Sequence, residues 1–211
     1  MSLIRPMFLA AAVSLSAAPA IPTLAQQPSA APTTMQAVKA QVALRDLWVD
    51  HIFWIRNVVI ETLAHNKSGA AAADAQVVAN AKQFAALIEP FYGKSASEKL
   101  FALLAGHYGA IKQYLDAGTN PTAKEAARAA AMRNADEIAV FLAGANPNLP
   151  VGTVRALLDS HVGQHIEQIN QLRAKQFQAE ANTWEMMKEH VYMIADAMAG
   201  ALVKQFPAKF S

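Results

Sequence analysis

The 211-residue chain contains no cysteine, and this absence removes a group of functions at once. Disulfide bonds, thiolate nucleophiles, iron–sulfur clusters and cysteine-based zinc sites are all excluded. Glycine and proline are also few, at 9 and 10 residues, and they cluster between long stretches rich in alanine. Because alanine favours helices, and both glycine and proline interrupt them, we expect an all-α domain.

The chain also lacks a marked excess of charge of either sign. Its formal net charge is +2, from 18 basic and 16 acidic residues. Proteins that bind a nucleic-acid phosphate backbone carry a basic stripe or patch, and nothing in this sequence resembles one. We therefore expect no nucleic-acid partner.

A clean membrane-spanning run is missing as well, although residues 7–20 are mainly apolar. This run follows Arg5 and precedes Thr23-Leu24-Ala25, a small-x-small sequence typical of signal-peptide cleavage. Pro19 and Pro22 interrupt it as a spanning helix. The expected domains are a secretory signal peptide (1–25), a disordered leader rich in Gln, Pro and Ala (26–36) and a helical bundle domain (37–211). We expect a periplasmic or secreted protein with no stable membrane anchor after cleavage.

From Met35 onward, apolar residues recur with the 3.6-residue period of a helix. The pattern predicts six helices: from Met35 to near Asn66, over about 72–89, from Ser95 or Ser97 to about 117, from Asn120 to about 143, over about 151–174, and over about 177–206. Pro90 and Gly93 are expected to end the second helix. Ser95 or Ser97 is expected to cap the third.

Three of these helices carry a histidine in the same local setting. A large apolar pair stands three and four residues before His51, His107 and His161, and position +4 is Ile55, Ile111 or His165. These positions share one helical face. The alternate helices contain related segments, which begin at Asn80, at Asn134 and more faintly at Ile194. The fold class that follows is a six-helix bundle built from three repeated helical hairpins, with the odd helices at its centre.

The equivalent histidines suggest a metal centre. His51, His107 and His161 would converge from three hairpins, His165 would share a face with His161, and His190 on the last helix would complete the set. Imidazole nitrogens suit zinc, copper or iron. Met186, Met187, Met193 and Met198 would also suit copper, although their spacing favours core packing. The alternative interpretation is that duplication copied histidines that serve only the core.

Arg56 lies in a stretch that is otherwise apolar, so we expect it to need an acidic partner. Asp136, Glu137 and Asp196, from the segments of the alternate helices, are the predicted partners in a structural ion pair. An anion site at Arg56 is the second interpretation. The sequence contains no nucleophile elbow, no His-Glu-x-x-His and no dinucleotide fingerprint, so an enzyme is the less favoured expectation.

Several motifs resemble a family of small, largely uncharacterised bacterial all-helical proteins, some of which are labelled acetylglutamate kinase. The resemblance covers about residues 44–210 and rests on four segments: Leu47-Trp48-x-x-His51-x-x-Trp54-x-Arg56, Pro90-Phe91-Tyr92-Gly93, Asn134-Ala135-Asp136-Glu137-Ile138-Ala139 with Asn146-Pro147, and Gln205-Phe206-Pro207-x-Lys209-Phe210. In the family an acidic residue often precedes each repeated histidine; here Asp50 keeps it, whereas Gly106 and Ser160 replace it. No glycine-rich phosphate cradle supports a kinase.

Two functions follow as hypotheses. The first is an exported helical-bundle protein that binds a metal ion or small ligand through inward histidines. The second is a non-enzymatic interaction or stress-related protein, with a protein partner, whose histidines are only structural.

Overall fold

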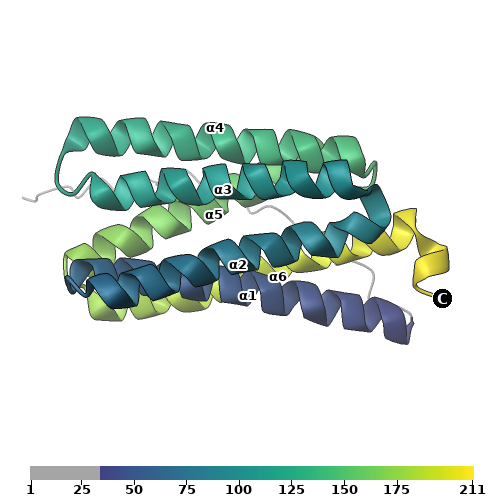
Figure 1. Cartoon of the computed structure of the whole chain (residues 1–211), viewed down its shortest axis with the longest axis horizontal. Coiled ribbons are helices and arrows are strands. Elements are labelled where there is room, and N and C mark those ends of the chain that lie inside the picture. Colours follow the sequence, from purple (N-terminus) through teal and green to yellow (C-terminus); the bar gives the residue numbers. More distant parts are fainter. Residues whose placement is uncertain (1–33) are drawn as a thin grey trace, which may run out of the picture.

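The computed structural model describes residues 34–211. The predicted signal peptide, 1–25, and most of the predicted leader, 26–36, therefore lie outside the described residues. Six α-helices and one short 3-10 helix follow each other: α1 (Met35–Leu63), α2 (Lys67–Tyr92), α3 (Lys94–Asp116), α4 (Pro121–Ala145), α5 (Val151–Arg173), α6 (Phe177–Gln205) and η1 (Pro207–Lys209). Figure 1 shows the α-helices as long, roughly parallel or antiparallel rods. The predicted all-α six-helix bundle is confirmed.

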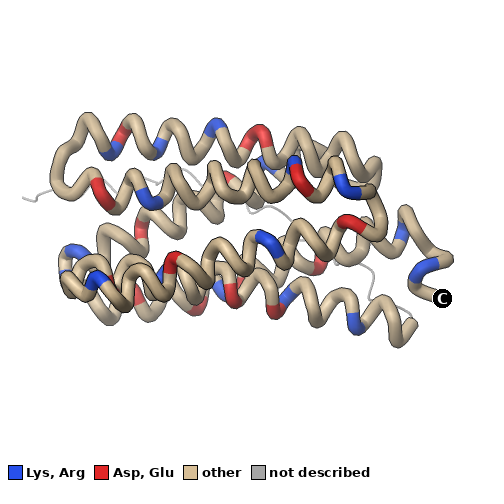
Figure 2. The backbone as a smooth tube through the Cα atoms, viewed as in Figure 1, with Lys and Arg blue, Asp and Glu red and all other residues tan. Residues whose placement is uncertain are grey.

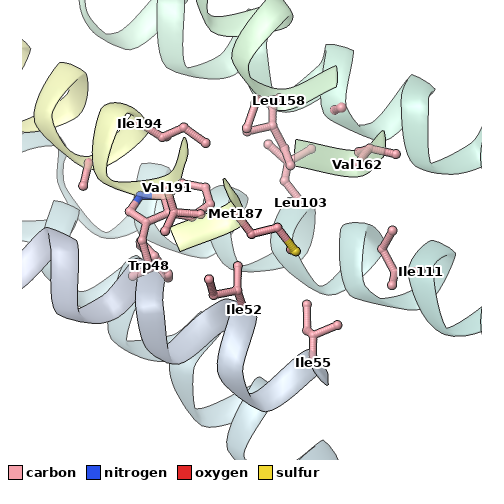
Figure 3. Close-up of a cluster of buried hydrophobic side chains, with 14 of the residues drawn as sticks. Trp48, Ile52, Ile55, Leu103, Ile111, Leu158, Val162, Met187, Val191 and Ile194 are labelled. Carbon is pink, nitrogen blue, oxygen red and sulfur yellow. The ribbon is translucent and has the colours of Figure 1, made fainter. Parts of the chain in front are cut away.

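The helices pack against their neighbours in chain order, and α6 returns to pack against α1. Helix α5 also contacts α1 and α3 across the interior, so the odd helices meet at the centre, as the sequence predicts. Figure 3 shows apolar side chains from α1, α3, α5 and α6 converging there, among them Ile52, Ile111, Val162 and Met187. Met187 and Val162 are 0% exposed.

Several helix starts are fixed by side chains that accept hydrogen bonds from backbone N–H groups of the first turn. Thr34 accepts from Ala37, Asn66 from Gly69 and Asn120 from Ala123. The Thr34 cap explains why α1 begins at Met35, inside the predicted leader.

The predicted start of α3 is wrong. Its N-cap is Gly93, in a left-handed conformation with φ of 82°, and Ser97 is buried inside the helix. The Ser97 hydroxyl donates instead to the Ala85 carbonyl of α2 at 2.8 Å. Helix α2 passes Pro90, the first of its two predicted stops, and ends at Tyr92 with the second, Gly93, as its C-cap.

The three turns that join α1 to α2, α3 to α4 and α5 to α6 begin in the same way, although the middle turn is longer by one residue. Each helix is followed by an alanine and then by a residue with positive φ, which is His65, Gly118 or Lys175. The N–H of that residue donates to the carbonyl three residues earlier. The three hairpins therefore share a turn as well as a helix pair.

The exterior carries charges of both signs. Figure 2 shows Lys or Arg and Asp or Glu interspersed along the helices in this view. Within residues 34–211, no helix combines the length and apolarity that crossing a membrane requires.

Candidate metal centre

Four histidines lie together on the axis of the bundle. His51 comes from α1, His107 from α3, and His161 and His165 from α5. Their exposed fractions are 7%, 3%, 1% and 1%. One nitrogen from each ring lies within 4.8 Å of the others. The structure thus brings together four of the five histidines that the sequence singled out.

The cluster sits between two layers of apolar side chains. Trp48, Leu104 and Leu158, three residues before the histidines of the odd helices, border it on one side. On the other side, four residues after His51 and His107, lie Ile55 and Ile111, each 1% exposed. His165 takes the third position of that second layer, and it is therefore the one polar residue at a level where the other two odd helices place isoleucine.

The closest approaches in the cluster involve Nε2 atoms. His161 Nε2 lies 3.3 Å from His51 Nε2 and 3.1 Å from His165 Nε2. Tetrahedral ligands at 2.0 to 2.1 Å from a metal ion are separated by about 3.3 to 3.4 Å. The separation of 3.3 Å therefore matches two ligands of a shared ion, and that of 3.1 Å is slightly shorter.

Hydrogen bonds between the rings do not satisfy all the ring nitrogens of the cluster. A neutral ring nitrogen carries either one proton or one in-plane lone pair, yet His161 Nε2 faces two other Nε2 atoms. Among the described residues, both ring nitrogens of His107 and the Nδ1 atoms of His161 and His165 have no hydrogen-bond partner. Buried polar atoms normally have one, so the cluster has an excess of unsatisfied lone pairs or N–H groups.

The four imidazoles are held neutral. Burial lowers the pKa of His51 to about 3, with a further contribution from His107. Burial lowers that of His107 to about 4, and the nearby Asn134 side chain opposes this shift without forming a hydrogen bond to the ring. For His161 and His165 the pKa falls well below the ordinary value, first through burial and then through neighbouring histidines. Neutral imidazole is the form that binds metal.

His190 takes a different role from the predicted one. Its Nε2 lies 2.9 Å from the carbonyl oxygen of Leu157, and it does not belong to the four-histidine group. Asn80 and Asn134 donate to the carbonyls of Leu47 and Leu103 in the same way, at 2.9 and 3.1 Å. Each carbonyl belongs to the residue four positions before a cluster histidine, so these bonds fix each hairpin at the level of the cluster.

Gly106 provides space for one of these bonds. A Cβ atom at this position would lie 3.0 Å from the amide nitrogen of Asn134, which is the donor to Leu103. Gly106 thus permits a close approach of α4 to α3.

The predicted partners of Arg56 are wrong. Arg56 Nε and Nη2 donate to Glu180 at the start of α6, at 2.6 and 2.7 Å, and Gln168 donates to the same carboxylate. Two of the three predicted partners are engaged elsewhere: Asp196 binds Arg45, and Asp136 binds Arg155. Glu180 is 2% exposed, so Arg56 neutralises a buried carboxylate. The contact with Glu180 is the structural ion pair of the first interpretation.

Two hollows are candidate ligand sites. One, of about 470 Å³, lies along α4 and α5 and contains none of the clustered histidines. The other, of about 30 Å³, borders His51, His107 and His161, and its remaining lining is apolar: Trp48, Phe84, Leu100, Leu104, Ile138, Leu142, Leu158 and Met198. We take the smaller cavity as the relevant one, since it borders three of the four clustered histidines.

Comparison with family models, with curated proteins and with solved structures finds no match to this chain.

Proposed function

We propose that this chain is an exported helical-bundle protein that binds one transition-metal ion through His51, His107, His161 and His165. The observation that carries the proposal is the convergence of four buried, neutral imidazoles, one nitrogen of each within 4.8 Å of the others. An ion would give a partner to one ring nitrogen of His107, neither of which has one among the described residues, and a common partner to the three neighbouring Nε2 atoms of His51, His161 and His165. The alternative, in which the histidines only fill the core, leaves that His107 nitrogen without a partner, at a cost of about 1 to 3 kcal/mol.

The donor set favours zinc or copper over iron. Among the described residues the group consists of histidines alone, whereas non-haem iron sites usually combine histidines with a carboxylate. Four nitrogen donors near tetrahedral spacing suit zinc. Copper accepts imidazole as well, and a monovalent copper ion would bring less charge into a site with no acidic ligand.

The test is metal analysis of the mature protein, purified without chelator and then stripped and titrated with zinc or copper. We expect about one ion per chain. The variant His161→Gln removes the nitrogen that contacts two others and should reduce binding at least 100-fold, while His65→Gln, at an exposed histidine, should retain it. Circular dichroism establishes that both variants are folded. A wild-type chain that takes up neither metal would overturn the proposal.

Export is tested separately. The proposed signal peptide predicts a mature N-terminus at Gln26, after Ala25. N-terminal sequencing of protein recovered from the periplasm or medium checks it, and a full-length protein retained in the cytoplasm would contradict it.

A further inference from the structure

The small cavity beside the cluster has the size of a ligand with two or three atoms. Its volume is about 30 Å³, and a single water needs about 10 to 15 Å³ of such space. A sugar, nucleotide or amino acid is far too large. All six helices contribute to the lining, so the cavity lies on the bundle axis.

The cavity reaches the cluster from one side. His51, His107 and His161 line it, whereas His165 does not. An ion held by the four histidines would therefore face the cavity between His51, His107 and His161. His165 would bind it from the side away from the cavity. A zinc ion can expand from four ligands to five, and a fifth ligand would enter from this side. A copper(I) ion holds no more than four, so there the incoming molecule would take the place of one histidine nitrogen.

The walls select for a neutral molecule. Apart from the three histidines, the lining is apolar, and transfer of a hydrated anion into such surroundings is costly. One polar group is present in a wall residue: the indole Nε1 of Trp48 is buried and has no hydrogen-bond partner among the described residues. An occupant with a lone pair can bind the ion and accept from an N–H donor.

We infer that the cavity admits a small neutral diatomic molecule, which binds the metal ion on its Trp48 and Leu104 side. This inference rests on the proposed metal site. It assigns the protein a second ligand, of the class that includes carbon monoxide, nitric oxide and dioxygen, and it gives the apolar layer before the histidines a role beyond packing.

The test uses carbon monoxide as the probe and copper(I) as the ion. Mature protein is loaded with copper(I) without oxygen, its copper content is measured, and carbon monoxide is titrated while the infrared C–O stretch is recorded. We expect one carbon monoxide per copper and a single sharp band. Leu104→Phe, or Leu142→Phe should the first variant not fold, fills the cavity and should weaken carbon monoxide binding at least tenfold at unchanged copper content.

A matched control is Leu87→Phe, at a half-buried leucine of α2 outside the cavity lining, which should keep the affinity within twofold. A copper-loaded chain without a C–O band would overturn this inference and leave the metal site standing. Equal binding in wild type and in the cavity-filling variants would overturn it too. A chain that takes up zinc but no copper(I) would also end the inference and keep the proposed function, whereas uptake of neither metal would end both.

Discussion

His190 Nε2 lies 2.9 Å from the carbonyl oxygen of Leu157, where it occupies the place that Asn80 and Asn134 occupy in the other two hairpins. The bond explains why a buried histidine stands close to the cluster without joining it. The donor is an imidazole in the third hairpin and a carboxamide in the first two, and both reach a carbonyl in the turn before a cluster histidine.

The variant His190→Asn should therefore behave differently from His190→Ala. Asparagine can restore the bond to Leu157, whereas alanine removes it and leaves a cavity, at a cost of about 2 kcal/mol in the free energy of unfolding. Urea unfolding measures the difference, and we expect His190→Asn to lose less than half as much. Metal content should stay at one ion per chain in both variants. Loss of the metal in His190→Asn would place His190 among the ligands.

The stability of the metal-free protein should depend on pH in a defined direction. The pKa values of His51 and His107 are lowered to about 3 and about 4, from an ordinary value of about 6.5. Below pH 6.5 the unfolded chain binds protons that the folded chain does not. These two histidines therefore leave the free energy of unfolding unchanged above pH 6.5. As the pH falls from 6.5 toward 4, the free energy of unfolding decreases by about 1.4 kcal/mol per pH unit for each histidine.

Urea unfolding between pH 7.5 and 4.5 checks this dependence. The variant His107→Leu removes one of the four buried histidines and should make the profile shallower by one proton. An unchanged profile in this variant would mean that His107 does not titrate as its burial requires.

The Arg56 and Glu180 pair should be costly to break from one side. Arg56→Met leaves the Glu180 carboxylate, 2% exposed, with Gln168 as its remaining partner, and should destabilise the fold by about 3 kcal/mol. The double variant Arg56→Met, Glu180→Leu should recover most of that loss. Thermal unfolding compares the two. Lys94→Met, in the exposed pair with Glu98, is the control and should change stability by less than about 0.5 kcal/mol.

The spacing of residues predicted the cluster well. Helical period and repetition placed His51, His107 and His161 on equivalent faces, and the i, i+4 relation added His165. These are local properties, because an amphipathic helix turns its apolar face inward whatever its neighbours are. The start of α1 at Met35 was also predicted. The start of α3 was less predictable, since the position of its first turn depends on the cap at Gly93.

Two tertiary relationships were beyond sequence reasoning. Comparison of the repeats aligned Ile194 with Asn80. In the structure His190, one helical turn earlier, makes the hydrogen bond equivalent to that of Asn80. Because a histidine replaces an asparagine there, the sequence hides the correspondence. Arg56 pairs with Glu180, which stands 124 residues away at the start of α6. The acids in the repeated segments were more conspicuous in the sequence, but which acid meets the arginine depends on how α6 packs against α1.

The shared hairpin turn leads to a last prediction. His65 and Lys175 adopt φ angles of 58° and 57°, in the left-handed region where a side chain costs roughly 1 to 2 kcal/mol. Gly118 fills the same place in the middle hairpin without that cost, because glycine has no Cβ. Lys175→Gly should therefore raise the free energy of unfolding by about 0.5 to 1 kcal/mol, after the greater entropy of glycine in the unfolded chain is subtracted. Gly118→Ala should lower it by about 1 kcal/mol. Urea unfolding measures both changes, and we expect free energies of unfolding that shift in opposite directions. Destabilisation by Lys175→Gly would contradict this, because it would mean that the lysine side chain stabilises the turn by more than its backbone strain costs.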